Sequence, residues 1–163
     1  MNVCKVTLAC ALGWVALCTA VAAEQLPKSG TISVHTGFKT SGEVMEVAEK
    51  RPQGHGSSIG VSFNDQGSGP LHGGPVACFW TFFTTDSGAK NKGYCAFGDS
   101  DGDRMFVDWS GTGSADGSQG VLELAGGTGK YAGIQGNGEW KCKDVGPNGQ
   151  ENCMQRFNYR LAQ

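Results

Sequence analysis

The stretch VACFWTFFTTDSGAKNKGYCAF, residues 76–97, decides the fold. Two apolar and β-branched runs flank Thr85–Gly88, a segment made of residues typical of tight turns. If Cys78 lies opposite Cys95, the same register pairs other residues on one face: Trp80 with Gly93 and Val76 with Phe97. Cross-strand neighbours in a hairpin lie close enough for a disulfide. The stretch therefore predicts an antiparallel hairpin joined by a Cys78–Cys95 bond.

A second hairpin of the same kind is predicted near the end of the chain. Its turn is Gly146–Gly149, and pairing Cys142 with Cys153 across it sets Gly138 against Phe157. The aromatic and aliphatic residues of this hairpin then share one inward face: Trp140, Phe157, Tyr159 and Leu161. We therefore expect a Cys142–Cys153 bond, while the two other pairings of four cysteines stay open on sequence grounds alone.

The first residues are typical of a cleavable signal peptide. Lys5 precedes an apolar run from Val6 to Val21, and Val21-Ala22-Ala23 offers the small residues that a signal peptidase needs. The run is short for a bilayer span and has no basic flank after it, so no stable membrane anchor is expected. We therefore predict a signal peptide at 1–23, one domain at 24–163, and a secreted or periplasmic location.

Removal of the signal peptide changes the cysteine count and the charge. Cys4, Cys10 and Cys18 are removed with the signal peptide, which leaves four of the 7 cysteines. An even number of cysteines in an exported chain favours disulfides over a metal site. One of the 13 basic residues and none of the 15 acidic ones leave, so the net charge moves from −2 to −3. The remaining basic residues are scattered, which argues against a nucleic-acid partner or an anionic membrane surface.

Short β-rich runs alternate with glycine, asparagine and aspartate turns along the rest of the chain. This spacing predicts an all-β protein, built as an antiparallel meander, sandwich or barrel. The runs are Thr31–Thr36, Gly42–Ala48, Ser57–Phe63, Pro75–Thr84, Lys92–Phe97, Met105–Ser110, Gly120–Leu124, Gly136–Lys143 and Cys153–Leu161.

The first hairpin is apolar on its second face as well. That face carries Ala77, Phe79, Phe83, Tyr94 and Ala96. A strand that is apolar on both faces is expected to be buried on both. Two coverings are open, a second subunit in a homo-oligomer or the Gln66–Gly74 loop.

One acidic cluster is a weak metal candidate. Asp99, Asp101 and Asp103 alternate along the chain and could hold a cation such as calcium. The spacing differs from the helix–loop–helix calcium loop, which has glycine sixth and glutamate twelfth. A type I′ hairpin turn at Asp101-Gly102 is the favoured interpretation, and no metal or other cofactor is predicted.

No catalytic constellation is recognised. His35, His55 and His72 lie in separate segments, and no Gly-x-Ser-x-Gly elbow is present. The aromatic residues expected to point inward suggest instead a pocket: Trp80, Phe97, Trp109, Trp140 and Phe157. The alternative is a plainly packed core, and a buried ionisable group beside the tryptophans would favour an enzyme.

The segment LAGGTGKYAGIQGNG, residues 124–138, resembles the glycine-rich segment of the allene oxide cyclase barrel-like and dirigent-like superfamily. Residues 97–106, FGDSDGDRMF, and Trp109-Ser-Gly are similar to the preceding strands of its exported bacterial members. The similarity spans most of 30–162. It implies a small closed antiparallel barrel of about eight strands, often assembled as a dimer or trimer.

Within the glycine-rich segment, Gly126–Gly129 predicts a tight turn. Lys130 and Tyr131 then form a single helical turn that plugs one end of the barrel, with Tyr131 as the stopper. This makes the motif architectural rather than catalytic. In the plant enzymes of the superfamily the barrel holds an unstable lipid epoxide and steers its cyclisation, but the residues that do so have no counterpart that can be placed here.

These observations leave three hypotheses for function. The leading one is non-catalytic binding of a small hydrophobic ligand, or service as a stable extracellular module. The second is a cyclase or isomerase-like enzyme that uses the barrel interior as a template. The third is an oligomeric surface protein without a ligand.

Overall fold

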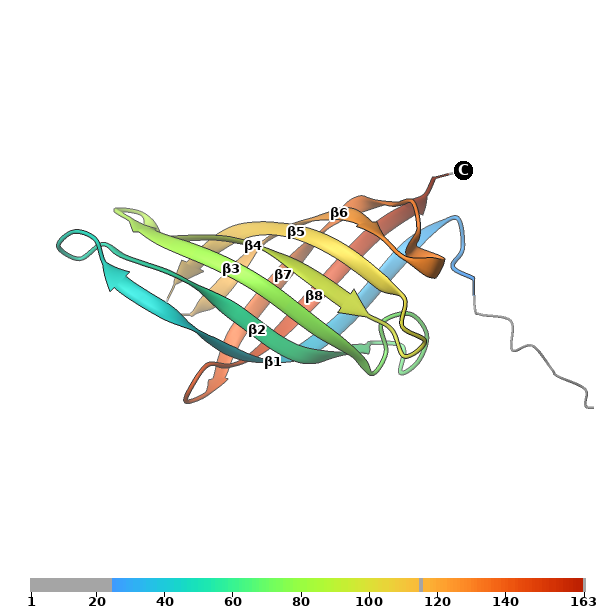
Figure 1. The fold of residues 1–163 in the computed structure, drawn as a ribbon, viewed down its shortest axis with the longest axis horizontal. Helices are drawn as coiled ribbons and strands as arrows, with labels where there is room; N and C mark the ends of the chain where they lie inside the picture. Colours follow the sequence, from blue (N-terminus) through green and yellow to red (C-terminus); the bar gives the residue numbers. More distant parts are fainter. Residues whose placement is uncertain (1–24, 115, 163) are drawn as a thin grey trace, which may run out of the picture.

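The computed structural model describes residues 25–114 and 116–162, which form a closed barrel of antiparallel strands connected in chain order (Figure 1). The strands are β1 Ser29–Glu46, β2 Pro52–Asn64, β3 Gly74–Thr85, β4 Gly88–Gly98, β5 Arg104–Ser114, β6 Gly117–Gly127, β7 Ile134–Gly146 and β8 Gln150–Leu161. A 3₁₀ turn, η1 Gly129–Tyr131, lies between β6 and β7. The predicted all-β barrel is confirmed, while the predicted signal peptide at 1–23 lies outside the described residues.

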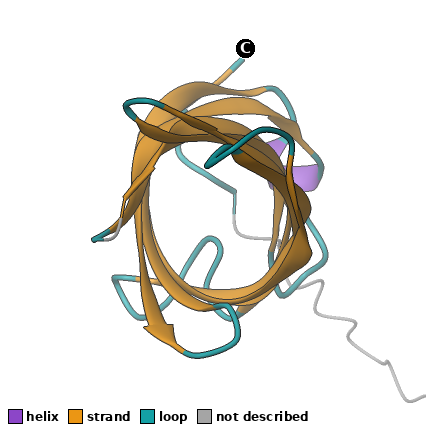
Figure 2. Ribbon diagram, turned by 90° about the vertical axis from the view of Figure 1, so that its left-hand side faces the viewer, coloured by secondary structure: helices purple, strands orange, loops and turns teal. Residues whose placement is uncertain are grey.

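Up-and-down connectivity gives the barrel two different ends. The turns after β1, β3, β5 and β7 form one end, here called the mouth, which faces the viewer in Figure 2. The connections after β2, β4 and β6, including η1, form the opposite end, here called the plug end. Within the described residues, no helix has the length and apolarity needed to cross a bilayer.

The nine predicted runs correspond to eight strands, because the first two are parts of β1. The prediction of a break between Thr36 and Gly42 was wrong. The plug-end part of β1 pairs with β8, from Ser29 to Lys39, and the mouth-end part pairs with β2, from Val34 to Glu46. Strands of a closed barrel are staggered, and a strand at the closing seam must be long enough to reach both neighbours.

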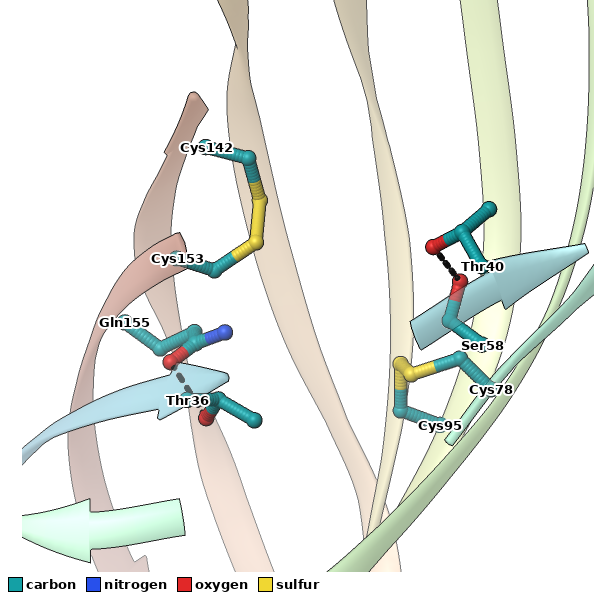
Figure 3. The surroundings of a disulfide bond; sticks show 8 residues. All are labelled: Thr36, Thr40, Ser58, Cys78, Cys95, Cys142, Cys153 and Gln155. Atoms are coloured by element: carbon teal, nitrogen blue, oxygen red, sulfur yellow. Dashed lines mark hydrogen bonds between the residues drawn. A yellow bond between two sulfur atoms is a disulfide. The ribbon is translucent and has the colours of Figure 1, made fainter. Parts of the chain in front are cut away.

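Both predicted disulfides are confirmed, Cys78–Cys95 between β3 and β4 and Cys142–Cys153 between β7 and β8. The predicted registers hold as well: Trp80 faces Gly93, Val76 faces Phe97 and Gly138 faces Phe157. These two strand pairs are four strands apart in the ring, so the disulfides lie on opposite walls of the interior (Figure 3).

The turn at Asp101-Gly102 is confirmed, but its predicted type is wrong. A type I′ turn needs positive φ at both central residues, and only Gly102 has it, at 93°. The N–H of Gly102 donates to the carbonyl of Asp99 at 3.0 Å, so the β-turn is centred one residue earlier, on Ser100-Asp101, and Gly102 follows it. Asn148 and Gly149, in the second hairpin, do both have positive φ, 67° and 73°.

The second face of the first hairpin is not covered by the Gln66–Gly74 loop, so that alternative was wrong. Phe79 is 71% exposed, and Phe83 and Tyr94 are also exposed. The loop instead turns Leu71 into the core, where the Leu71 carbonyl accepts a hydrogen bond from the buried Ser62 hydroxyl at 2.8 Å. Coverage by a second subunit stays a prediction.

Removing one disulfide tests how much of the stability depends on these hairpins. We expect the double variant Cys142→Ala/Cys153→Ala to lose about 2–4 kcal/mol of unfolding free energy, because the bond restricts the unfolded chain. Urea denaturation of residues 24–163 measures the loss. Mass spectrometry of the non-reduced protein should find no free thiol, and an equally stable double variant would contradict the expectation.

Candidate functional site

The plug-end half of the barrel interior is filled with side chains. Phe97 and Phe157 meet edge to face at 5.3 Å between ring centroids and are fully buried. The other buried apolar residues of this half are Ile32, Val34, Leu71, Val76, Met105, Val107, Leu124, Tyr131, Ile134 and Tyr159. This half is a packed core, as expected for a barrel of this size.

Tyr131 lies at the plug end, fully buried on the 3₁₀ turn η1. Its hydroxyl donates to Asp99 Oδ2 at 2.6 Å, and Lys130 Nζ lies 3.0 Å from the same oxygen. Burial, together with the Asp99 carboxylate, raises the pKa of Tyr131, so the phenol keeps its proton. The turn therefore attaches the β6–β7 connection to the β4–β5 connection.

The three aspartates of the weak metal candidate take part in this attachment. Asp101 Oδ2 accepts from Lys130 Nζ at 2.8 Å, and Asp103 Oδ2 accepts from the Lys130 N–H at 2.9 Å. Burial alone would lower the pKa of Lys130, but the hydrogen bonds to Asp101 and Asp99 outweigh it and raise that pKa. The carboxylates of the acidic cluster therefore pair with Lys130, which lies 29 residues from Asp101 in the sequence.

The mouth half of the interior contains a cavity of about 290 Å³ instead of a packed core. Three tryptophans line it, Trp80 on β3, Trp109 on β5 and Trp140 on β7. The other lining residues are Phe38, Thr40, Ser58, Cys78, Phe82, Ala89, Asn91, Cys95, Phe97, Ser118, Leu122, Cys142, Glu151, Cys153 and Gln155. The volume is at the small end of the usual range for ligand pockets.

The tryptophan rings do not fill the cavity, because each ring packs against a glycine of a nearby strand. A Cβ on Gly56 would lie 2.5 Å from the Trp80 ring, and one on Gly93 would lie 2.6 Å from the Trp109 ring. A Cβ on Gly111 would likewise lie 2.6 Å from the Trp140 ring. Any side chain at these glycines would displace an indole, so the glycines allow the rings to lie along the wall.

Several polar atoms near the cavity have no partner among the described residues. The indole nitrogens of Trp80 and Trp109 and the Oδ1 of Asn91 are buried without a hydrogen bond. Other polar side chains inside the barrel are paired, Thr36 with Gln155 at 3.0 Å and Thr40 with Ser58 at 2.7 Å (Figure 3). Unpartnered buried groups are costly, and they are common where a ligand or water binds.

Among the described residues, Glu151 is the one ionisable side chain that lines the cavity. It lies on β8 beside the Cys142–Cys153 bond, with its carboxylate within 4.8 Å of both sulfurs. Desolvation, with a smaller contribution from Asp144, raises the pKa of Glu151, although a hydrogen bond with Thr40 opposes the shift. The two sulfurs are bonded to each other, so they cannot act with Glu151 as thiolate ligands for a metal.

The structure brings together four of the five aromatic residues predicted for the pocket. Trp80, Phe97, Trp109 and Trp140 line the cavity, while Phe157 is buried behind Phe97 and does not. The sequence interpretation missed Glu151, Asn91, Phe38 and Phe82. A signal for Glu151 was present, because it precedes Cys153 by two residues and alternation along a strand therefore points it inward.

The three histidines lie away from the cavity. His35 is on the outer face of β1, where its Nδ1 lies 3.0 Å from Asp65 Oδ1. His55 is exposed on β2, and His72 lies in the β2–β3 loop. The site that the structure assembles therefore consists of aromatic rings, polar side chains and a single carboxylate.

Two broader depressions lie on the outer surface of the sheet, each of at least about 1100 Å³. Outward side chains such as Lys92, Glu123 and Lys141 line them. The smaller interior cavity is the better candidate site, because it lies inside the barrel and has unpartnered polar atoms beside it.

Comparisons with known proteins support the fold and do not assign a family. No protein-family model matches the chain, and no curated protein matches it. The structure is similar to that of a protein of unknown function from the DUF3224 family of Shewanella oneidensis MR-1. That similarity has a TM-score of 0.56 at 14% identity, and it covers 83% of this chain and 98% of the other.

The pH dependence of stability tests the burial of Glu151. Its pKa in the folded protein lies above the ordinary value of 4.5, so the folded state holds more protons than the unfolded state between those two values. The unfolding free energy should therefore fall as pH rises through this window. We expect Glu151→Gln to lack this decrease in unfolding free energy and to be more stable than the wild type at pH values above the window. Urea denaturation at several pH values measures both effects.

Glu139→Gln is the matched control for this measurement. Glu139 is exposed on the outer face of β7, and the substitution makes the same change in charge. The control should keep the wild-type pH profile. Equal profiles for Glu151→Gln and the wild type would mean that the Glu151 carboxyl is not desolvated.

Proposed function

We propose that this protein is an exported barrel that binds a small, largely apolar molecule in its interior without transforming it. The observation that carries the proposal is the cavity at the mouth half, lined by Trp80, Trp109 and Trp140. A barrel built only as a structural module would gain stability from filling this space, since a cavity loses both dispersion contacts and burial.

Contrast between the two halves supports the proposal. In the plug-end half, bulky side chains such as Phe157 and Met105 occupy the interior. In the mouth half the inward positions next to the tryptophans are glycines, including Gly56, Gly93 and Gly120. The barrel interior is therefore filled by bulky inward side chains at the plug end and left partly empty by inward glycines at the mouth end.

Export is part of the proposal. The two disulfides are consistent with an oxidising environment, and the signal peptide predicted at 1–23 would deliver the chain to the periplasm or the medium. The proposed mature chain would begin near residue 24, just before the barrel.

Membership of the allene oxide cyclase barrel-like and dirigent-like superfamily is also proposed. The barrel topology agrees with the fold that the resemblance implies. The cyclisation carried out by the plant enzymes is not carried over, because fold alone does not transfer a reaction.

An enzyme is the second candidate, and Glu151 favours it. A carboxyl group with a raised pKa beside aromatic rings is suited to act as a general acid or base for an isomerase or cyclase. Binding is preferred over catalysis because, among the described residues, Glu151 is the only ionisable group that lines the cavity, so no second ionisable group is present to act as the complementary acid or base.

Self-association is a third candidate, based on the exposed apolar side chains on the outside of β2, β3 and β4. They are Ile59, Val61, Phe63, Phe79, Phe83 and Tyr94. Exposed apolar side chains that share the outer face of neighbouring strands are typical of an interface, and the occupant proposed is a second copy of the chain.

Intrinsic fluorescence provides a direct test of ligand binding. Trp14 lies in the predicted signal peptide, so each tryptophan of residues 24–163 lines the cavity. We expect small ring compounds such as indole or 4-ethylphenol to change the emission and to raise the melting temperature. At a concentration of 100 times Kd, the added stability would be about 2.7 kcal/mol.

Filling the cavity should abolish that response. Ala89→Phe adds a ring at a position that lines the cavity, whereas Thr112→Phe adds one on the outer face of the neighbouring strand β5. The first variant should lose binding and the second should keep it. If no compound in a broad panel of phenols, indoles and lipids shifts either signal, the binding proposal fails.

Analytical ultracentrifugation of residues 24–163 tests self-association. We expect the wild type to form a dimer or larger oligomer, and Phe79→Ser to shift it towards monomer because Phe79 is the most exposed aromatic residue of the patch. A wild type that stays monomeric at high micromolar concentration would contradict this proposal.

A further inference from the structure

We propose that the cavity selects a compact organic cation, such as a quaternary or alkylated ammonium ion, held between the indole rings and the Glu151 carboxylate. This inference rests on the proposed binding function and names the class of ligand. It follows from the charge inside the cavity, the orientation of the rings and the size of the space.

The charge inside the cavity has one sign. Glu151 lines it, and no lysine, arginine or histidine among the described residues does. Asp144, which also acts on Glu151, adds negative charge near the mouth. Because an ionised carboxylate in a partly desolvated site needs a counter-charge, an anionic ligand is disfavoured and a cation is favoured.

Among the described residues, no lysine or arginine lines the cavity or shifts the pKa of Glu151. Arg51 is paired with Asp86 at 2.6 Å, on the outside of the turns. Lys90 and Lys143 point outward from β4 and β7, at exposed positions of their strands. The arrangement contrasts with the plug end, where Lys130 lies within 3.0 Å of both Asp99 and Asp101.

The aromatic rings offer the second half of a cation site. The indole rings of Trp80, Trp109 and Trp140 all line the cavity, and each lies in close contact with a glycine of the wall. Trp109 and Trp140 meet at an interplanar angle of 75°, with 5.1 Å between centroids, and form a corner. Indole faces carry negative potential and attract ammonium groups, and several rings at different angles can surround one.

The size and the remaining polar atoms fit a small ligand. A cavity of about 290 Å³ exceeds the roughly 150 Å³ that accommodates benzene. It therefore has room for an ammonium group with a short polar tail. The unpartnered Asn91 Oδ1 is an acceptor for a hydroxyl or N–H on that tail.

A pair of ligands that differ only in charge tests the inference. Choline and 3,3-dimethylbutan-1-ol have the same shape, but a carbon replaces the nitrogen in the second. We expect choline to bind the wild-type protein about tenfold more tightly, because the cation gains attraction to the rings and to the carboxylate. Titration with tryptophan fluorescence and calorimetry measures both Kd values.

Glu151→Gln and Glu139→Gln separate the interior carboxylate from general surface charge. Glu151→Gln should weaken choline binding about tenfold and leave the binding of the neutral alcohol unchanged. Glu139→Gln, on the outer face of β7, should change neither. If Glu151→Gln does not fold, the comparison of the two ligands on the wild type decides the question.

The outcomes distinguish the ligand class from the binding function. Equal affinity for choline and its neutral analogue, or binding of indole or 4-ethylphenol without any binding of choline, would overturn the cation proposal and leave the binding function intact. Failure of every compound, charged or neutral, would overturn both.

Discussion

The fixed interior width of a closed eight-stranded barrel is the constraint on which the rest of this structure depends. Every second residue of every strand must point into a space of fixed width, so the choice of inward side chains decides whether the interior is solid or hollow. Here the inward residues change along the barrel axis, from bulky groups such as Phe157 at the plug end to tryptophans set against glycines at the mouth. The cavity is thus a property of alternating positions spread over all the strands.

Electrostatics divides the barrel in the same way. At the plug end the carboxylates of Asp99 and Asp101 are neutralised by Lys130, and the buried phenol of Tyr131 completes the hydrogen bonds, so this end is structural. At the mouth, Glu151 has no such basic partner among the described residues, and it lines the same cavity as the three tryptophans. A charged group without a partner destabilises a folded protein, and such groups are concentrated at functional sites. The proposals for the interior follow from this difference between the two ends.

Much of the fold could be predicted from the sequence because it depends on neighbours along the chain. The hairpins of Cys78–Cys95 and Cys142–Cys153 have turn residues at their midpoints, and period-two alternation then sets each register. The same logic led to errors where a local signal was misleading. The runs Thr31–Thr36 and Gly42–Ala48 were predicted as separate strands, yet pairing with β8 on one side and β2 on the other makes them one continuous β1. The aspartates at 99–103 were only a weak metal candidate beside the favoured turn, and in the structure Lys130 pairs with Asp99 and Asp101.

By itself, the sequence determined the all-β class, and it favoured the observed cysteine pairing and the inward direction of the tryptophans, since turn chemistry and strand alternation act over a few residues. Only the tertiary structure decided how the ring closes, that Lys130 reaches Asp99, that the loop at Gln66–Gly74 sends Leu71 inward, and that Glu151 lies at the same cavity as Trp80. These relations join strands far apart in the chain. Their positions depend on the stagger and closure of the whole sheet, which no local pattern encodes.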